Sequence, residues 1–150
     1  MASLTSKMGA TTRSVCFHLH YLAWTVALFS VLGSLFFSEV MGFAPCVLCW
    51  YQRIFLFPLV VTIGVGIVLR DQRMRYYSLP LSTAGLLLAA YHNLIYFGLI
   101  PERISPCTAG VSCSAKQIEW LGFITIPMLS LFAFLVITMA LHFHRPRSES

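Results

Sequence analysis

Two cysteines separated by two residues, Cys46 and Cys49, stand at the start of an apolar stretch, and Arg53 follows four positions after the second. Positions i and i+4 share one face of a helix, so a helix that begins near Cys46 places Arg53 one turn below Cys49. A helix N-terminus and a cationic neighbour both favour the thiolate, which is the reactive form of cysteine. The spacing therefore predicts a redox-active cysteine pair with its own thiolate stabiliser.

The composition indicates which kind of element positions this pair. Of 150 residues, 58% are hydrophobic and only 10% are charged, whereas a soluble domain carries about 25% charged residues. Four windows contain no Asp, Glu, Lys or Arg: 14–38, 54–69, 76–101 and 120–144. A membrane-spanning helix needs roughly 17–25 apolar residues, and three of the windows reach this length unaided. The window 54–69 has 16 residues, so its helix must start near Cys46 and include Arg53.

We therefore predict an all-α membrane protein, a four-transmembrane-helix bundle that forms one domain over residues 1–150. The expected helices cover about residues 18–37, 46–69, 76–100 and 120–142. The loop at 101–119 is the only substantial connection, and residues 1–15 are expected to be disordered. The first helix is expected to be retained, because its apolar stretch is too long for a signal peptide and no A-x-A-like cleavage site follows it.

The basic residues predict the orientation of this bundle. Seven fall on the side of the two termini and the turn between the second and third helices: Lys7, Arg13, Arg70, Arg73, Arg75, Arg145 and Arg147. Three fall on the opposite side: Arg53, Arg103 and Lys116. Cytoplasmic segments carry the excess of Lys and Arg, so both termini are expected in the cytoplasm. The net charge is +5, but the basic residues flank apolar windows, where they set the membrane topology. The charge therefore does not predict a nucleic-acid partner.

Five cysteines divide into the pair Cys46 and Cys49, a second pair in the outward loop, Cys107 and Cys113, and Cys16 alone. Disulfides persist outside the cytoplasm, and C-x-x-C spacing suits thiol–disulfide exchange. Two alternatives remain open: a tetraspan membrane protein with structural disulfides, or a Cys₄ metal site of the zinc type. The C-x₅-C spacing of the loop pair is loose for zinc, and we assign no metal ligand. Cys16 is interpreted as an inert thiol.

Arg53 and His92 are the two residues within the helices that we interpret as binding residues. An arginine near a helix end can simply extend its side chain to the interface, yet an ionisable residue inside an apolar segment marks a functional site by default. His92 falls two turns before the outer end of the third expected helix. That position is equally compatible with hydrogen bonds from the imidazole to a neighbouring helix and with contact between the imidazole and a ligand.

Two dithiols on one side of a membrane favour an electron relay. The loop pair, Cys107 and Cys113, can reach a soluble partner, whereas Cys46 and Cys49 are anchored to a helix and can exchange with the loop pair by thiolate attack on a disulfide. The chain contains no haem-ligand pair, flavin fingerprint or nucleotide motif. The electron acceptor is therefore expected to be lipid-soluble, a quinone that enters from the bilayer, and Arg53 could donate a hydrogen bond to its carbonyl.

The chain resembles the DsbB family of disulfide bond formation proteins over nearly its whole length. The segment Cys46-Val47-Leu48-Cys49-Trp50-Tyr51-Gln52-Arg53 matches the family's C-V-L-C-x-Y-x-R. The second point of similarity is the loop cysteine pair between the third and fourth expected helices. These two cysteines are only six positions apart, which is similar to the compact BdbC-like branch. Vitamin K epoxide reductase relatives place the loop pair before the C-x-x-C pair, the reverse of the order found here.

This resemblance implies a membrane thiol:quinone oxidoreductase in the bacterial inner membrane. In the family, the loop disulfide oxidises a DsbA-like thioredoxin-fold partner outside the cytoplasm, and the C-x-x-C pair reoxidises the loop. Electrons then pass to quinone, ubiquinone or menaquinone, beside the second C-x-x-C cysteine, which is Cys49 in this chain. The family's quinone-site arginine corresponds to Arg53, and its outer-end histidine corresponds to His92. The implied outcome is disulfide bond formation in exported proteins.

Overall fold

The computed structural model describes residues 2–71, 73–101, 119–120 and 124–143, and for residues 2–17, 119–120 and 124 it describes the backbone alone. The helices are α1 (Ala2–Leu35), α2 (Val47–Leu69), α3 (Met74–Tyr96) and α4 (Ile126–Phe143). A π-helical turn, η1 (Phe36–Val40), extends α1. Two short strands, β1 (Glu119–Trp120) and β2 (Ile124–Thr125), pair antiparallel immediately before α4.

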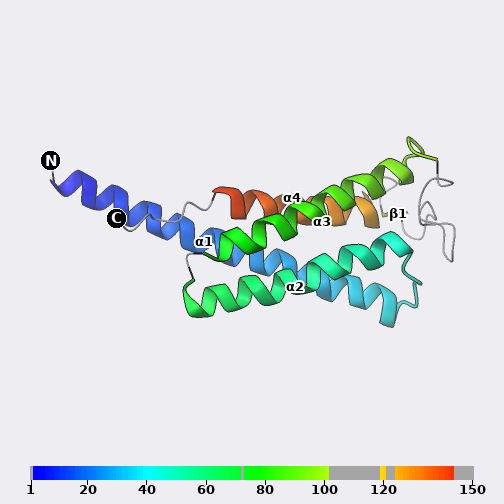
Figure 1. The fold of residues 1–150 in the computed structure, drawn as a ribbon. Coiled ribbons are helices and arrows are strands. Elements are labelled where there is room, and N and C mark those ends of the chain that lie inside the picture. The colour runs from blue at the N-terminus through cyan, green and yellow to red at the C-terminus, as the bar shows by residue number, and fades with distance from the viewer. Residues whose placement is uncertain (1, 72, 102–118, 121–123, 144–150) are drawn as a thin grey trace.

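The four helices lie side by side in a bundle, and the first turns of α1 project beyond it (Figure 1). Each helix packs against the next along the chain, and α4 closes the bundle against α1. The largest group of buried apolar side chains comes from all four helices: Ala23, Ala27, Leu56, Leu59, Ile63, Met74, Ala89, Phe134, Ile137, Ala140 and Leu141. The predicted all-α fold is confirmed, since only the short β1–β2 pairing departs from helix among these elements.

The outward faces of the helices are apolar as well. Three helices are long and apolar enough to cross a membrane, over His18–Val40, Val47–Leu69 and Ile126–Phe143. Large side chains point away from the core along these spans, for example Val68 at 80% and Phe132 at 66% exposed. A protein surrounded by water rarely exposes such continuous apolar surface. These helices therefore identify a multi-pass membrane protein.

Three helix boundaries differ from the prediction. The prediction that residues 1–15 are disordered is wrong, because α1 begins at Ala2 and no proline interrupts the chain before Pro45. Helix α3 ends at Tyr96 rather than near residue 100, because Gly98 adopts a positive φ of 72°, the backbone conformation that commonly ends a helix.

The fourth helix starts later than the prediction places it, at Ile126 instead of residue 120. Trp120, Ile124 and Thr125, which the prediction places in this helix, belong to the strand pairing instead, in which Glu119 lies opposite Thr125 and Trp120 opposite Ile124. Pro127 then falls in the first turn of α4, where the N–H that proline lacks would have had no partner within the helix.

Helices α1 and α2 approach closely where the indole of Trp24 packs against Gly64. The Trp24 indole N–H donates to the carbonyl oxygen of Val60 across the two helices, with an N–O distance of 3.1 Å. A Cβ atom at Gly64 would lie 2.8 Å from Trp24 Nε1, so the missing side chain makes room for this bond. The contact fixes the position of α1 against the helix that carries the cysteine pair.

Gly85 provides a test of the α3–α4 packing. A Cβ atom added at Gly85 would overlap the ring of Phe134, which is fully buried. We expect Gly85→Ala to lower the free energy of unfolding by about 1–3 kcal/mol, the typical effect of inserting atoms into a packed core. Thermal unfolding of the purified protein in detergent measures this change.

The matched control for that substitution is Gly33→Ala in α1, where an added Cβ atom meets nothing within 4 Å. Because alanine is the better helix former by about 1 kcal/mol, Gly33→Ala is expected to be neutral or stabilising. Equal unfolding temperatures for the two variants would contradict the packing described for α3 and α4.

Candidate active site

The cysteine pair lies at the first turn of α2, and the local sequence explains why the helix begins there. Gly42 turns the chain with a positive φ of 68°, and Pro45 then directly precedes Cys46. Cys46 itself is the N-cap residue of α2, with extended backbone angles (φ −69°, ψ 167°), and its sulfur accepts a hydrogen bond from the backbone N–H of Cys49. The sulfur thus satisfies one of the free N–H groups at the start of the helix.

The two sulfurs are close together. Cys46 Sγ lies 3.0 Å from Cys49 Sγ, and both residues are free thiols in this structure. Cys46 is only 7% exposed, while Cys49 is half-buried. A disulfide bond is about 2.05 Å long, so a small movement of either side chain closes the pair. The geometry suits reversible formation of a disulfide.

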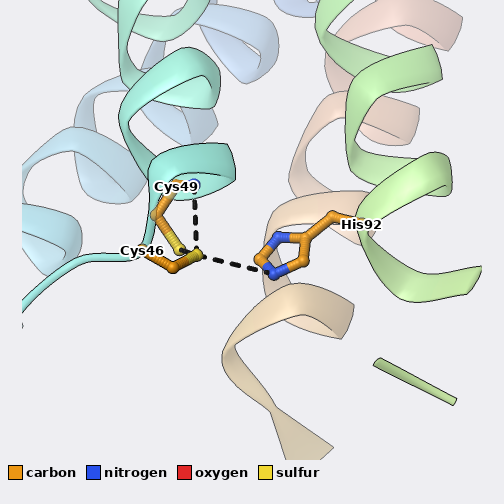
Figure 2. A group of neighbouring side chains, drawn as sticks. All are labelled: Cys46, Cys49 and His92. Carbon is orange, nitrogen blue, oxygen red and sulfur yellow. Dashed lines mark hydrogen bonds between the residues drawn. The ribbon is translucent and has the colours of Figure 1, made fainter. Parts of the chain in front are cut away.

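His92 of α3 faces this pair from the neighbouring helix (Figure 2). Its Nε2 atom lies 3.8 Å from Cys46 Sγ, and its side chain is 1% exposed. The other ring nitrogen, Nδ1, lies 3.2 Å from the amide nitrogen of Gln52. An amide nitrogen can only donate, so Nδ1 accepts and the ring proton resides on Nε2. His92 therefore directs an N–H group at the sulfur of Cys46.

These donors favour the thiolate of Cys46, which lies just outside the apolar span of α2. The pKa of Cys46 is lowered, first because the thiol of Cys49 donates a hydrogen bond to its sulfur, and further because His92 and the backbone N–H of Cys49 face it. Burial of the sulfur opposes the shift without cancelling it. The first cysteine of the motif is thus prepared as a thiolate.

Arg53 lies one turn further along α2 and is 6% exposed. Its guanidinium donates to Ser34 of α1 twice, from Nε to the hydroxyl and from Nη2 to the backbone carbonyl, each at 2.8 Å. The guanidinium carbon also lies 5.4 Å from the ring centre of Trp50. Arg53 therefore does not extend to a water interface, because its guanidinium is held inside the bundle against α1.

Of the residues predicted to form the site, the structure brings Cys46, Cys49 and His92 together and places Arg53 on the adjacent turn of α2. The loop cysteines, Cys107 and Cys113, lie outside the described residues. The same holds for the side chain of Cys16.

Two polar contacts of the site were not predicted from the sequence. Gln52 holds the ring of His92, and Ser34 holds the guanidinium of Arg53. Gln52 carried a usable signal, since it is an uncharged polar residue inside an apolar helix and one position from Arg53. Ser34 carried none, because small hydroxyl residues are common within membrane helices.

The chain is similar to known disulfide bond formation proteins. Residues 17–144 match the family described as "Disulfide bond formation protein DsbB". The chain is 45% identical over 142 residues to a "Probable disulfide formation protein" of Metapseudomonas resinovorans, covering 94% of this chain and 99% of that protein. It is 46% identical over 117 residues to "Disulfide bond formation protein C" of Bacillus subtilis (strain 168), covering 78% of this chain and 85% of that protein.

No solved structure matches the chain. The family match nevertheless covers all four helices apart from the first turns of α1, and both relatives named above extend over most of the chain and most of their own length. The resemblance carried by the C-V-L-C-x-Y-x-R segment is therefore confirmed. On this basis the chain belongs to the DsbB family of disulfide bond formation proteins and has a role in disulfide bond formation.

Proposed function

We propose that the chain is a membrane thiol:quinone oxidoreductase that reoxidises a DsbA-like thioredoxin-fold protein outside the cytoplasm. The observation that carries the proposal is the thiol pair at the N-terminus of α2, with sulfurs 3.0 Å apart and His92 at Cys46. A pair prepared in this way can open and close a disulfide repeatedly. Family membership supports the disulfide-forming activity, while the quinone, the partner and the order of transfer are our inference.

The proposed relay transfers two electrons at each step. The reduced partner gives up two thiol hydrogens and becomes a disulfide, while the Cys107–Cys113 disulfide opens to two thiols. The loop dithiol then reduces the Cys46–Cys49 disulfide by thiolate attack through a mixed disulfide. In that reaction the N–H of His92 stabilises negative charge on Cys46 when its sulfur leaves.

The residues beside the pair fit a quinone as the final acceptor. Ser34 accepts hydrogen bonds from Nε and Nη2 of Arg53. Among the described residues no acceptor is bound to Nη1, so the N–H groups of Nη1 remain available to a carbonyl oxygen. Trp50, on the same turn, presents a half-exposed aromatic ring beside the guanidinium. A bound quinone supplies the acceptor for two electrons and two protons. Arg53 would hold its carbonyl, and Cys49, on the same helical face, would face it.

The proposed function also requires a defined arrangement in the membrane. We propose four spanning helices, with α3 as the fourth because its 23 residues are long enough. Its buried Ser78, Ser82, His92 and Asn93 lower its hydropathy but face the bundle rather than lipid. Both termini then lie in the cytoplasm of a bacterial cell, and both cysteine pairs lie at the outer surface.

Reporter fusions test this topology. Fusions after Arg73 and after Ser148 should report the cytoplasm, and a fusion near Ala109 should report the outside, because basic residues gather on the first side. Position 109 lies outside the described residues, so the fusion also gives the first placement of the loop. A cytoplasmic loop would place both cysteine pairs in a reducing compartment and would contradict the proposed relay.

Trapping of the partner tests the division of labour between the two pairs. With Cys113 changed to alanine, Cys107 cannot be released by its neighbour, so a mixed disulfide with the soluble partner should accumulate at least about tenfold above the parent. Non-reducing electrophoresis followed by mass spectrometry identifies the bonded cysteine. The converse variant, Cys107→Ala, is the matched comparison. Trapping on Cys46 alone would show that the helix pair, not the loop, meets the partner.

A further inference from the structure

We propose that the reduced Cys46–Cys49 pair and His92 together form a binding site for a soft divalent cation, with Zn²⁺ as the reference ion. The ion joins both sulfurs to Nε2 of His92 and leaves one coordination position for water. Metal binding at these three residues does not depend on the proposed function. Its consequence does: an ion on both sulfurs blocks reoxidation of the pair.

The donor atoms already stand near the required separation. Cys46 Sγ, Cys49 Sγ and a ring nitrogen of His92 all lie within 4.8 Å of one another. Zinc binds sulfur at about 2.3 Å and imidazole nitrogen at about 2.0–2.1 Å in tetrahedral geometry, so its ligand atoms lie roughly 3.5–3.8 Å apart. The distance from Cys46 Sγ to Nε2 is 3.8 Å. The 3.0 Å separation of the sulfurs must widen when the ion binds.

Gln52 supplies the outer contact that metal-binding histidines need. A coordinating histidine usually donates its other ring N–H to an oxygen, which fixes the ring. The Gln52 amide lies at Nδ1 of His92, 3.2 Å away through its nitrogen. Rotation of this amide by half a turn presents its oxygen instead. With the ring proton on Nδ1, that N–H donates a hydrogen bond to the amide oxygen, and Nε2 is free to bind the ion. The two hydrogen-bond states of Gln52 therefore correspond to the empty and loaded site.

Burial and charge also suit the ion. Cys46, His92 and Gln52 are all at least nine-tenths buried. Two thiolates and a neutral imidazole around Zn²⁺ sum to zero charge, which a buried site accommodates more readily than two unpaired thiolates. Arg53 on the next turn and the N-terminus of α2 are positive and oppose the ion. The site is consequently expected to bind reversibly rather than as tightly as a structural Cys₄ site.

The oxidation state of the pair decides whether the site exists. Binding forms two Zn–S bonds and one Zn–N bond, and it releases the protons still on the thiols; no electron moves. In the disulfide both sulfurs are bonded to each other, and no thiolate is left to coordinate. The cation therefore binds only the reduced chain, and bound cation and disulfide formation compete for the same two sulfurs.

The test uses the full chain with Cys16, Cys107 and Cys113 changed to serine, so that every thiol belongs to the pair. The reduced protein is titrated with Zn²⁺ against a competing indicator, and we expect one ion per chain. The oxidised protein should bind none. His92→Ala should weaken binding by at least about tenfold, and Gln52→Leu by about tenfold, the effect typical of losing an outer contact. His142→Ala, at an exposed histidine of α4, should bind as the parent does.

Substitution with Co²⁺ distinguishes the ligand set even if a variant is unstable, since the visible spectrum reports sulfur and nitrogen donors in the unmodified site. A spectrum with nitrogen coordination supports the proposal. Equal affinity in His92→Ala and the parent, or equal binding by oxidised protein, would overturn it. Quinone-dependent oxidation of partner thiols is measured in parallel on the unmodified chain, which keeps the loop cysteines. Normal oxidation there with no zinc bound by the reduced pair would overturn this inference alone, and zinc binding with no quinone-dependent oxidation would overturn the proposed function alone.

Discussion

Changing Cys49 to serine is expected to lower quinone-dependent thiol oxidation by three orders of magnitude or more, as loss of a covalent catalytic residue commonly does. The sulfur of Cys49 lies 3.0 Å from that of Cys46, and no other described sulfur lies beside Cys46 to close the disulfide. Serine has nearly the same size, so the first turn of α2 remains intact. The rate of thiol loss from a reduced thioredoxin-fold partner, followed with quinone in excess, measures the effect.

Cys16→Ser is the matched control for that experiment. Cys16 belongs to α1 and falls outside both pairs, so its replacement should leave the rate within about twofold of the parent. Loss of activity in Cys16→Ser would mean that the lone cysteine takes part in the relay. Full activity in Cys49→Ser would show that the Cys46–Cys49 disulfide is not an intermediate.

Changing Arg53 to alanine is expected to have two separable effects. It removes both hydrogen bonds to Ser34, each worth about 1.5–3 kcal/mol when the donor is charged, so the free energy of unfolding should fall by a few kcal/mol. It also removes the donor proposed for the quinone, which should raise the KM for quinone by roughly tenfold to a hundredfold. Denaturant unfolding and quinone kinetics at matched protein levels measure the two effects.

Two further variants separate these effects. Ser34→Ala removes one acceptor but leaves the guanidinium in place, so it should lower stability and spare most of the quinone affinity. Arg53→Lys keeps the charge but loses the planar fork that reaches two acceptors at once, so it should recover less of the quinone affinity than of the stability. If Ser34→Ala raised the KM as much as Arg53→Ala does, Arg53 would be a link between helices and not a quinone ligand.

The sequence predicts the helical architecture well because charge-free windows of spanning length admit few structures other than helices. It predicts the helix ends less well. The end of α3 depends on the conformation of Gly98, and the start of α4 depends on the strand pairing beside Pro127. Neither feature changes the apolar windows, since Trp120 and Ile124 are as apolar as a spanning helix requires.

The residues of the candidate site were predicted where chemistry and spacing coincide within one segment, and His92 was included through the family resemblance. The contacts that cross between helices were not predicted. The C-x-x-C pair and Arg53 share α2, so their order along the chain is enough to identify them. His92 stands 46 positions from Cys46, and its place at the sulfur follows only from the packing of α3 on α2. The contact of Arg53 with Ser34 likewise requires α1 to lie alongside α2, which composition cannot specify.

The measurement that tests the central claim most directly follows both substrates of the purified full chain at once. A reduced thioredoxin-fold partner and a quinone are mixed with the protein in detergent, and thiols and quinone are quantified over time. We predict that one quinone is reduced for every two partner thiols lost, and that Cys46→Ser stops both changes together. Thiol loss that is independent of quinone, or no thiol loss from a fully folded protein, would contradict the account.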